Sequence, residues 1–185
     1  QAGRVSVFTM KYVRGVSLAE TLESGRALPT DEVERLLLQV GDALDHAHRH
    51  GVVHRDLKPD NIMTDAQAGY VVMDFGIAKS VGGEQLTQTG GSIGTPKYMS
   101  PEQGQGLEVD GRSDYYSLGV VAYHALTGRP PFERNDPLST LYAHVHDPVP
   151  HPDLDSDEGR RLWGAIRLLL SKGPDDRPPD AASRR

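Results

Sequence analysis

Apolar side chains recur every three or four positions between residues 33 and 47. This spacing predicts an amphipathic helix that buries one face. The helix is expected to begin at Thr30, with that residue as its N-cap, and to end at Gly51.

A second run, from residue 118 to residue 126, is apolar on nearly every face of a helix. Ser113 is the expected N-cap, and Gly128 followed by Pro130 marks the expected end. A helix with almost no polar face belongs in the interior, so this segment is predicted to be central and buried.

Weaker patterns predict several shorter elements around these two helices. Strands are expected at 5–12, 52–53, 62–63 and 70–73, a turn at 13–15, and helices at 18–24, 138–146 and 158–172. Residues 77–101 are rich in Gly, Thr and Ser, show no periodicity and predict a long loop of the functional kind. The chain is therefore predicted to be mainly helical, with a few short strands.

Composition narrows the class of protein. A length of 185 residues is enough for one domain with a proper core. The net charge of −6 argues against nucleic acid as the main partner. The absence of cysteine excludes disulfides and thiolate metal sites, and it fits a reducing cytosol. The apolar run at 115–128 is shorter than the roughly 20 residues that a membrane helix requires.

Three histidines, His46, His48 and His50, lie near the end of the first predicted helix. The spacing of His46 and His50 suits a metal ion, but no carboxylate stands between them as in a zinc protease. Interaction of the imidazoles with the helix dipole is the preferred interpretation.

The segment His54-Arg55-Asp56-Leu57-Lys58-Pro59-Asp60-Asn61 carries the clearest chemistry. Asp56 can accept the proton of a hydroxyl nucleophile, and Lys58 can neutralise a phosphoryl oxygen. Asn61 can offer its amide oxygen to Mg²⁺. A surface turn rich in ion pairs is the alternative interpretation of any one of these residues alone.

Further motifs follow in order along the chain. Asp74-Phe75-Gly76 places a carboxylate at the end of a predicted strand, where it suits a hard cation. The others are Gly94-Thr95-Pro96-Lys97-Tyr98-Met99-Ser100-Pro101-Glu102, Ser113-Asp114-Tyr115-Tyr116-Ser117-Leu118-Gly119 and Pro174-Asp175-Asp176-Arg177-Pro178.

Together these motifs resemble the eukaryotic-like protein kinases of the bacterial serine/threonine type, over nearly the whole chain. The resemblance implies a protein-kinase-like α+β fold, of which this chain is the mainly α-helical C-terminal lobe. The implied reaction transfers the γ-phosphoryl group of ATP to Ser or Thr hydroxyls of proteins. Small-molecule kinases of the aminoglycoside type share the Asp…Asn loop but lack the Ser-Pro-Glu segment found here.

The resemblance also implies roles for individual residues. Asp56 is the expected catalytic base and Lys58 the stabiliser of the transferred group, with Thr95 bonded to both. Asn61 and Asp74 are expected to hold Mg²⁺, with Mn²⁺ as an alternative. The residues expected around the adenine of ATP are Met10 as gatekeeper, Lys11, Tyr12 and Val13 as hinge, and Met63 below the ring.

Other matched residues are expected to support the site. His54 and Phe75 are expected to pack together, Glu102 to pair with Arg177 in the interior, and Asp114 to brace the loop at 54–61. Thr87 and Thr89 lie where such kinases autophosphorylate. Arg55 is expected to pair with the resulting phosphothreonine.

The chain departs from the family because it shows no Gly-rich phosphate loop, no strand Lys and no helix Glu partner. Residues 1–16 are expected to be the last strand of an N-terminal lobe and the hinge. Residues 17–185 are expected to be the C-terminal lobe, truncated at its end, with a catalytic loop at 54–61 and an activation segment at 74–102. The fragment alone is expected to be weakly active and to expose an apolar patch.

The expected partners are ATP, protein substrates and the missing lobe, with no nucleic acid. Self-association for autophosphorylation would be compatible with this interpretation. The expected location is cytoplasmic, in a parent that can be anchored to a membrane outside this segment. The alternative function is a non-catalytic binding module built on a kinase lobe.

Overall fold

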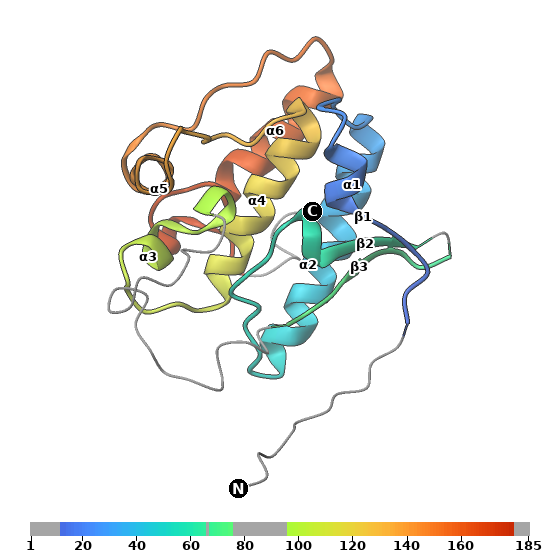
Figure 1. Ribbon diagram of the computed structural model, residues 1–185, viewed down its shortest axis with the longest axis horizontal. Helices are drawn as coiled ribbons and strands as arrows, with labels where there is room; N and C mark the ends of the chain where they lie inside the picture. The colour runs from blue at the N-terminus through green and yellow to red at the C-terminus, as the bar shows by residue number, and fades with distance from the viewer. Residues whose placement is uncertain (1–11, 66, 76–95, 180–185) are drawn as a thin grey trace, which may run out of the picture.

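The computed structural model describes residues 12–65, 67–75 and 96–179, and it places a small sheet beside a group of helices (Figure 1). The helices are α1 (Leu18–Leu22), α2 (Thr30–Arg49), α3 (Pro101–Gly104), α4 (Gly111–Thr127), α5 (Pro137–His146) and α6 (Asp157–Leu169). The strands are β1 (Gly15–Ser17), β2 (Ile62–Asp65) and β3 (Gly69–Val72). Three-residue 3₁₀ turns lie at Pro59–Asn61, Pro96–Tyr98 and Pro174–Asp176.

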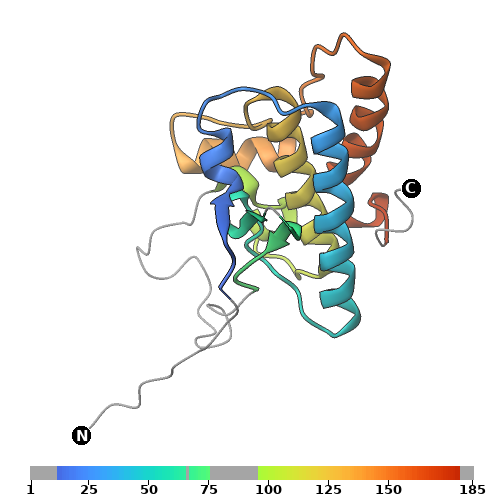
Figure 2. The ribbon, with the colours of Figure 1, turned by 90° about the vertical axis from the view of Figure 1, so that its right-hand side faces the viewer.

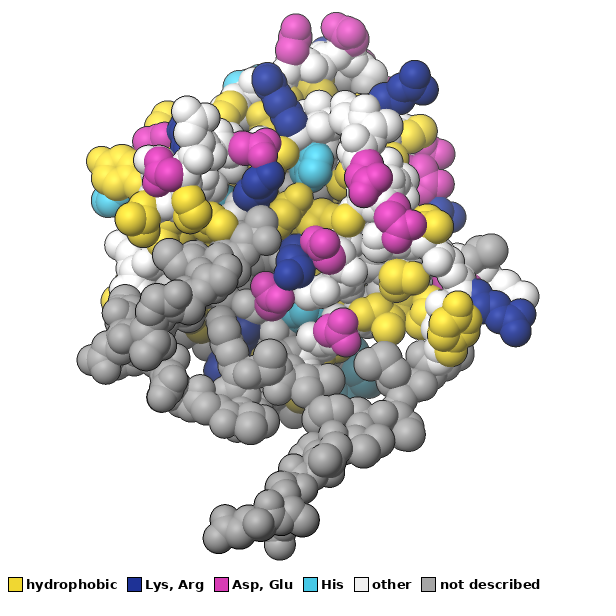
Figure 3. Space-filling view, in the orientation of Figure 1, with side chains coloured by type: hydrophobic (Ala, Val, Ile, Leu, Met, Phe, Trp, Pro, Cys, Tyr) yellow, Lys and Arg dark blue, Asp and Glu magenta, His cyan; other side chains and the backbone are white. Residues whose placement is uncertain are grey.

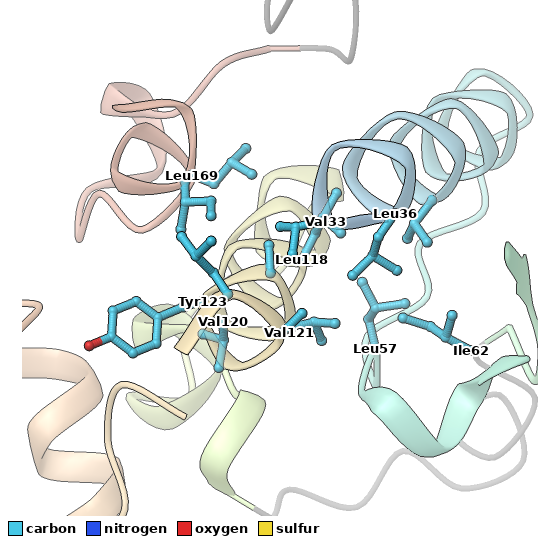
Figure 4. Close-up of a cluster of buried hydrophobic side chains, with 14 of the residues drawn as sticks. Val33, Leu36, Leu57, Ile62, Leu118, Val120, Val121, Tyr123 and Leu169 are labelled. Carbon is cyan, nitrogen blue, oxygen red and sulfur yellow. The ribbon is translucent and has the colours of Figure 1, made fainter. Parts of the chain in front are cut away.

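Helix α4 is the centre of the molecule, flanked by α2 and α6 (Figures 1 and 2). Every residue from Ser113 to Tyr123 is buried, which confirms the predicted interior helix. Leu118 and Val121 on α4 meet Val33 and Leu36 from α2, and Leu169 packs from α6 (Figure 4). The hydrophobic core therefore joins segments far apart in the sequence around one helix.

Helix α2 has the buried face that its sequence predicts. Val33, Leu36, Val40 and Leu44 are fully buried in the core. The expected cap is wrong, because Thr30 is the first helical residue and the N-cap position is occupied by Pro29, which makes no side-chain capping bond.

The three strands form an antiparallel sheet in the order β1-β2-β3. Gly15 begins β1, where a turn was expected, and a Cβ there would collide with the carbonyl of Thr64 on β2. Glycine is therefore needed for the close approach of these two strands. The strand expected at 52–53 is not formed; this short apolar pair is an irregular connection between α2 and the loop that follows.

The ends of the helices show which local signals are decisive. Gly128 ends α4 in the left-handed conformation (φ 77°), as predicted. Helix α4 begins before the expected cap, because the carboxylate of Asp110 accepts a hydrogen bond from the Arg112 N–H and caps the first turn. Helix α6 ends at Leu169 instead of residue 172, and α3 was not predicted.

Acidic and basic side chains are interspersed on the face of the molecule shown in Figure 3. In the ranges that the structure describes, no helix is both long and apolar enough to cross a membrane.

Candidate active site

The loop at 54–61 is attached to the central helix by one buried carboxylate. Asp114, in the first turn of α4, is 1% exposed. Its two oxygens accept the backbone N–H groups of His54 and Arg55, each at 2.8 Å. The ring Nε2 of His48 lies 2.8 Å from the same carboxylate. Two hydrogen bonds thus hold the start of the loop on α4, and the contact with His48 links the same carboxylate to α2.

Arg55 has an unusual backbone at this point. Its φ is 66°, a left-handed conformation that non-glycine residues rarely adopt. Its N–H is bound to Asp114, and its carbonyl accepts a hydrogen bond of 2.6 Å from the side chain of Gln103. These two bonds stabilise the strained residue from both sides.

His54 connects the loop to the end of the sheet. The ring is fully buried, and its Nε2 lies 2.9 Å from the carbonyl of Met73. A carbonyl only accepts, so Nε2 carries the proton, and Nδ1 can accept from the Asp56 N–H at 3.3 Å. The ring of Phe75 lies 4.9 Å away, centre to centre. The packing of His54 on Phe75 that the sequence predicted is therefore present.

The polar groups of the loop lie close together and reach solvent. Lys58 Nζ is 3.4 Å from the carboxylate of Asp56, whose side chain is 61% exposed. The amide nitrogen of Asn61 donates to the Asp56 carbonyl at 2.8 Å. Pro59 is buried and begins the 3₁₀ turn that brings Asn61 back toward Asp56. A base, a cation and an amide oxygen are thereby held in one short turn.

Asp74 is linked to this turn through the end of β3. The Met73 N–H donates to the Asn61 carbonyl at 2.8 Å. Asp74 is the next residue in the chain, so this bond keeps its backbone close to the loop. Asp74 is exposed and, like Arg55, has a positive φ, here 56°.

A carboxylate and an amide oxygen fit Mg²⁺, which takes oxygen ligands and completes its shell with water and substrate phosphates. The described residues contain no group of three or more His, Asp or Glu side chains that could hold a metal ion by itself. Asn61 and Asp74 offer one oxygen donor group each, and the chemistry of these donors fits Mg²⁺.

A buried ion pair fixes helix α3 and the start of α4 in place. Arg177 donates to Glu102 at 2.6 and 2.9 Å, and the Ser113 hydroxyl donates to the same carboxylate at 2.5 Å. Burial by itself raises the pKa of Glu102, but the bonds from Arg177 and Ser113 outweigh it and lower the pKa. Glu102 therefore stays ionised, and the predicted interior pair is present.

The described residues include only some of the remaining predicted site residues, namely those expected around the adenine of ATP and those expected in the loop at 74–102. Tyr12 is 81% exposed. Val13 is half-buried. Met63 lies inside the central strand β2, paired with Ser17 on β1 and Val71 on β3. The predicted residues Met10, Lys11, Thr87, Thr89 and Thr95 lie outside the described residues.

Two contributors were missed by sequence reasoning. Ser100 and Gln103 form a capping box on α3, which also presents Gln103 to Arg55. The spacing Ser-x-x-Gln is the signal that could have revealed it. His48 was attributed to the helix dipole, but it contacts Asp114.

Comparison with known proteins identifies the class. Residues 2–179 match the model of the protein kinase domain, and the chain belongs to the protein kinase family. It is 40% identical to serine/threonine-protein kinase PknB of Mycolicibacterium smegmatis over 99% of its length, and 40% identical to PknB of Mycobacterium tuberculosis over 100%. It is 41% identical over 98% of its length to a probable serine/threonine-protein kinase, SCO3848, of Streptomyces coelicolor.

The chain spans about 30% of the length of the two PknB proteins and 27% of the Streptomyces protein. The fold has the mainly helical character, with a small sheet, that the sequence predicted for a kinase lobe.

Proposed function

We propose that this chain is the C-terminal lobe of a protein kinase that transfers the γ-phosphoryl group of ATP to Ser or Thr side chains. The observation that carries the proposal is the arrangement of Asp56, Lys58 and Asn61 in one turn, joined to Asp74 through the bond between Met73 and Asn61. Phosphoryl transfer depends mainly on positioning and on neutralising charge, and this turn offers groups for both.

Asp56 orients the acceptor hydroxyl and receives its proton in this proposal, and its exposed carboxylate is accessible to a protein substrate. Lys58 neutralises charge on the transferred group. Asn61 and Asp74 hold Mg²⁺, which neutralises the phosphates of ATP when bound.

A second lobe, carrying the Gly-rich loop and the strand Lys, completes the ATP site in the longer protein. In the proposal, Tyr12 and Val13 belong to the hinge beside the adenine of ATP, and Met63 lies below the adenine ring.

Arg55 is proposed to receive a phosphothreonine at Thr87 or Thr89. Its side chain is exposed, and its backbone is held on both sides by Asp114 and Gln103. A guanidinium on a fixed backbone is suited to bidentate binding of phosphate.

The test replaces Asp56 with Asn in the longer protein that contains this chain. Asp56→Asn is expected to lower kcat by about 10²–10⁴-fold with ATP affinity unchanged, because it removes a positioned general base. Asp60→Asn is the matched control, since Asp60 is exposed in the same turn. Equal activity of both variants would refute the role of Asp56. ATP binding without transfer by the unmodified protein would favour a binding module.

A further inference from the structure

Side chains of α4 and α5 hold the 3₁₀ turn Pro96–Tyr98 in place. The carbonyl of Lys97 lies 3.0 Å from Nε2 of His144. The carbonyl of Tyr98 accepts a hydrogen bond of 2.7 Å from Ser117, and the Tyr98 hydroxyl lies 2.9 Å from His124. Two successive carbonyls of this half-buried turn are therefore fixed by side chains of different helices.

His144 is the most enclosed of these groups, with 0% exposure. Burial, assisted by the ammonium group of Lys172, lowers the pKa of His144 to about 4, so the ring is neutral at neutral pH. The Lys97 carbonyl only accepts, which places the proton on Nε2. Nδ1 is then free of a proton and accepts from the Tyr116 hydroxyl at 3.0 Å. One tautomer satisfies both contacts.

The surroundings of His144 prevent the ring from turning. The Phe132 ring packs against it in a T-shaped arrangement, with ring centres 5.0 Å apart. Lys172 Nζ donates to the His144 carbonyl at 2.7 Å and lies 4.4 Å from the centre of the Phe132 ring. Tyr116 in turn lies below Arg177, whose guanidinium carbon is 4.9 Å from the ring centre. The imidazole is thus connected to the buried Glu102–Arg177 pair.

The side chain of Lys97 makes a separate contact at the surface. Its ammonium group pairs with Glu133, and both side chains are partly exposed. The backbone carbonyl of Lys97 is therefore held from the interior, and its ammonium group is paired at the surface.

We propose that His144 is a positioning residue for the protein substrate: its Nε2–H orients the Lys97 carbonyl and with it the Pro96–Tyr98 turn that contacts the substrate. This inference rests on the proposed kinase function: the sequence Gly94-Thr95-Pro96-Lys97-Tyr98 is similar to the substrate loop of serine/threonine kinases, which would place this turn against the substrate. His144 itself touches neither ATP nor the reacting hydroxyl and acts through Lys97.

Two amide variants of the longer protein separate positioning from general packing. The amide nitrogen of Gln reaches the place of Nε2, whereas that of Asn reaches only the place of Nδ1. In peptide phosphorylation, His144→Asn is expected to raise the KM for peptide by about tenfold, because the Lys97 carbonyl loses its buried donor. The KM for ATP stays unchanged, and His144→Gln keeps the peptide KM within about twofold of wild type. Equal peptide KM values for the two variants overturn the proposal.

Hydrogen exchange gives a readout that does not depend on activity. The amides of residues 97–99 are expected to exchange about tenfold faster in His144→Asn than in wild type or His144→Gln, because the turn has lost one anchor. His146→Asn, on the exposed side of the same helix, is the control and leaves these amides unchanged. Unchanged exchange in His144→Asn refutes the anchor. Absence of any peptide phosphorylation by wild type, with this exchange pattern present, refutes the kinase function and not the anchor.

Discussion

Arg177 and Glu102, 75 residues apart in the sequence, form a bidentate ion pair in the interior, at 2.6 and 2.9 Å. The remaining N–H groups of the guanidinium donate to three backbone carbonyls, those of Ser171, Lys172 and Arg112. All five donors of Arg177 are therefore used, which is the condition under which a buried charge is tolerated. The pair holds α3, the start of α4 and the segment after α6 together.

Removing one partner leaves the other charge buried and unpaired. Glu102→Gln is expected to lower the free energy of unfolding by about 3–5 kcal/mol. Arg177→Lys is expected to be similarly costly, because an ammonium group cannot reproduce the planar fork. Urea unfolding followed by circular dichroism measures both.

Asp147→Asn provides the comparison, since the pair of Asp147 with Arg134 is partly exposed. Its expected cost is about 0–1 kcal/mol, as for other surface pairs. Losses of the same size in the Glu102 and Asp147 variants would show that the interior pair contributes no more than a surface one.

The elements that sequence patterns predicted well are those with many repeats of one spacing. Helix α2 shows its apolar face over several turns, and α4 is apolar on all sides, so both were located correctly. Helix α3 has four residues, which is too few for periodicity to be visible. The pair at 52–53 was interpreted as a strand because it is apolar and β-branched, but it finds no strand partner.

The contacts of the site depend on residues that are distant in the sequence. Asp114 binds the backbone of Arg55 across 59 positions, and His144 binds Lys97 across 47. No periodic signal marks such pairs. Asp114 was expected at the loop only because its motif resembles that of a known family. His144 lies outside those motifs, and only the structure relates it to Lys97.

Gly119 gives a test of how tightly α4 is packed. A Cβ at this position would lie 2.9 Å from Leu169 Cβ and 3.1 Å from Leu170 Cγ, so α6 would have to move. Gly119→Ala is expected to lower the free energy of unfolding by about 1–3 kcal/mol through overpacking. Thermal unfolding measures this loss.

Gly164 is the matched position, because it is exposed on α6 and an added Cβ would meet no atom within 4 Å. Gly164→Ala is expected to stabilise the helix by about 0.5–1 kcal/mol, since alanine loses less backbone entropy than glycine. A stabilising effect of Gly119→Ala would contradict this prediction and mean that α6 shifts to accommodate the added Cβ at little cost.

Because His144 is buried, we expect the free energy of unfolding to depend on pH. Its pKa is about 4 in the folded chain, and its ordinary value is 6.5. Between these values the unfolded chain binds the proton and the folded chain does not, so acid favours unfolding. The contribution of His144 to the free energy of unfolding is therefore fully present above pH 6.5 and falls as the pH is lowered toward 4. From pH 7 to pH 5 the expected loss is about 2 kcal/mol.

Urea unfolding of wild type and His144→Gln at pH 7 and pH 5 isolates this contribution, because other titrating groups cancel in the difference between the two proteins. The variant is expected to lose about 2 kcal/mol less than wild type between the two pH values, since glutamine cannot be protonated. His146→Gln is expected to follow wild type, because His146 is exposed. An equal loss in wild type and His144→Gln would mean that the folded chain accepts a proton on His144 as readily as the unfolded chain does, and that burial does not lower the pKa of His144.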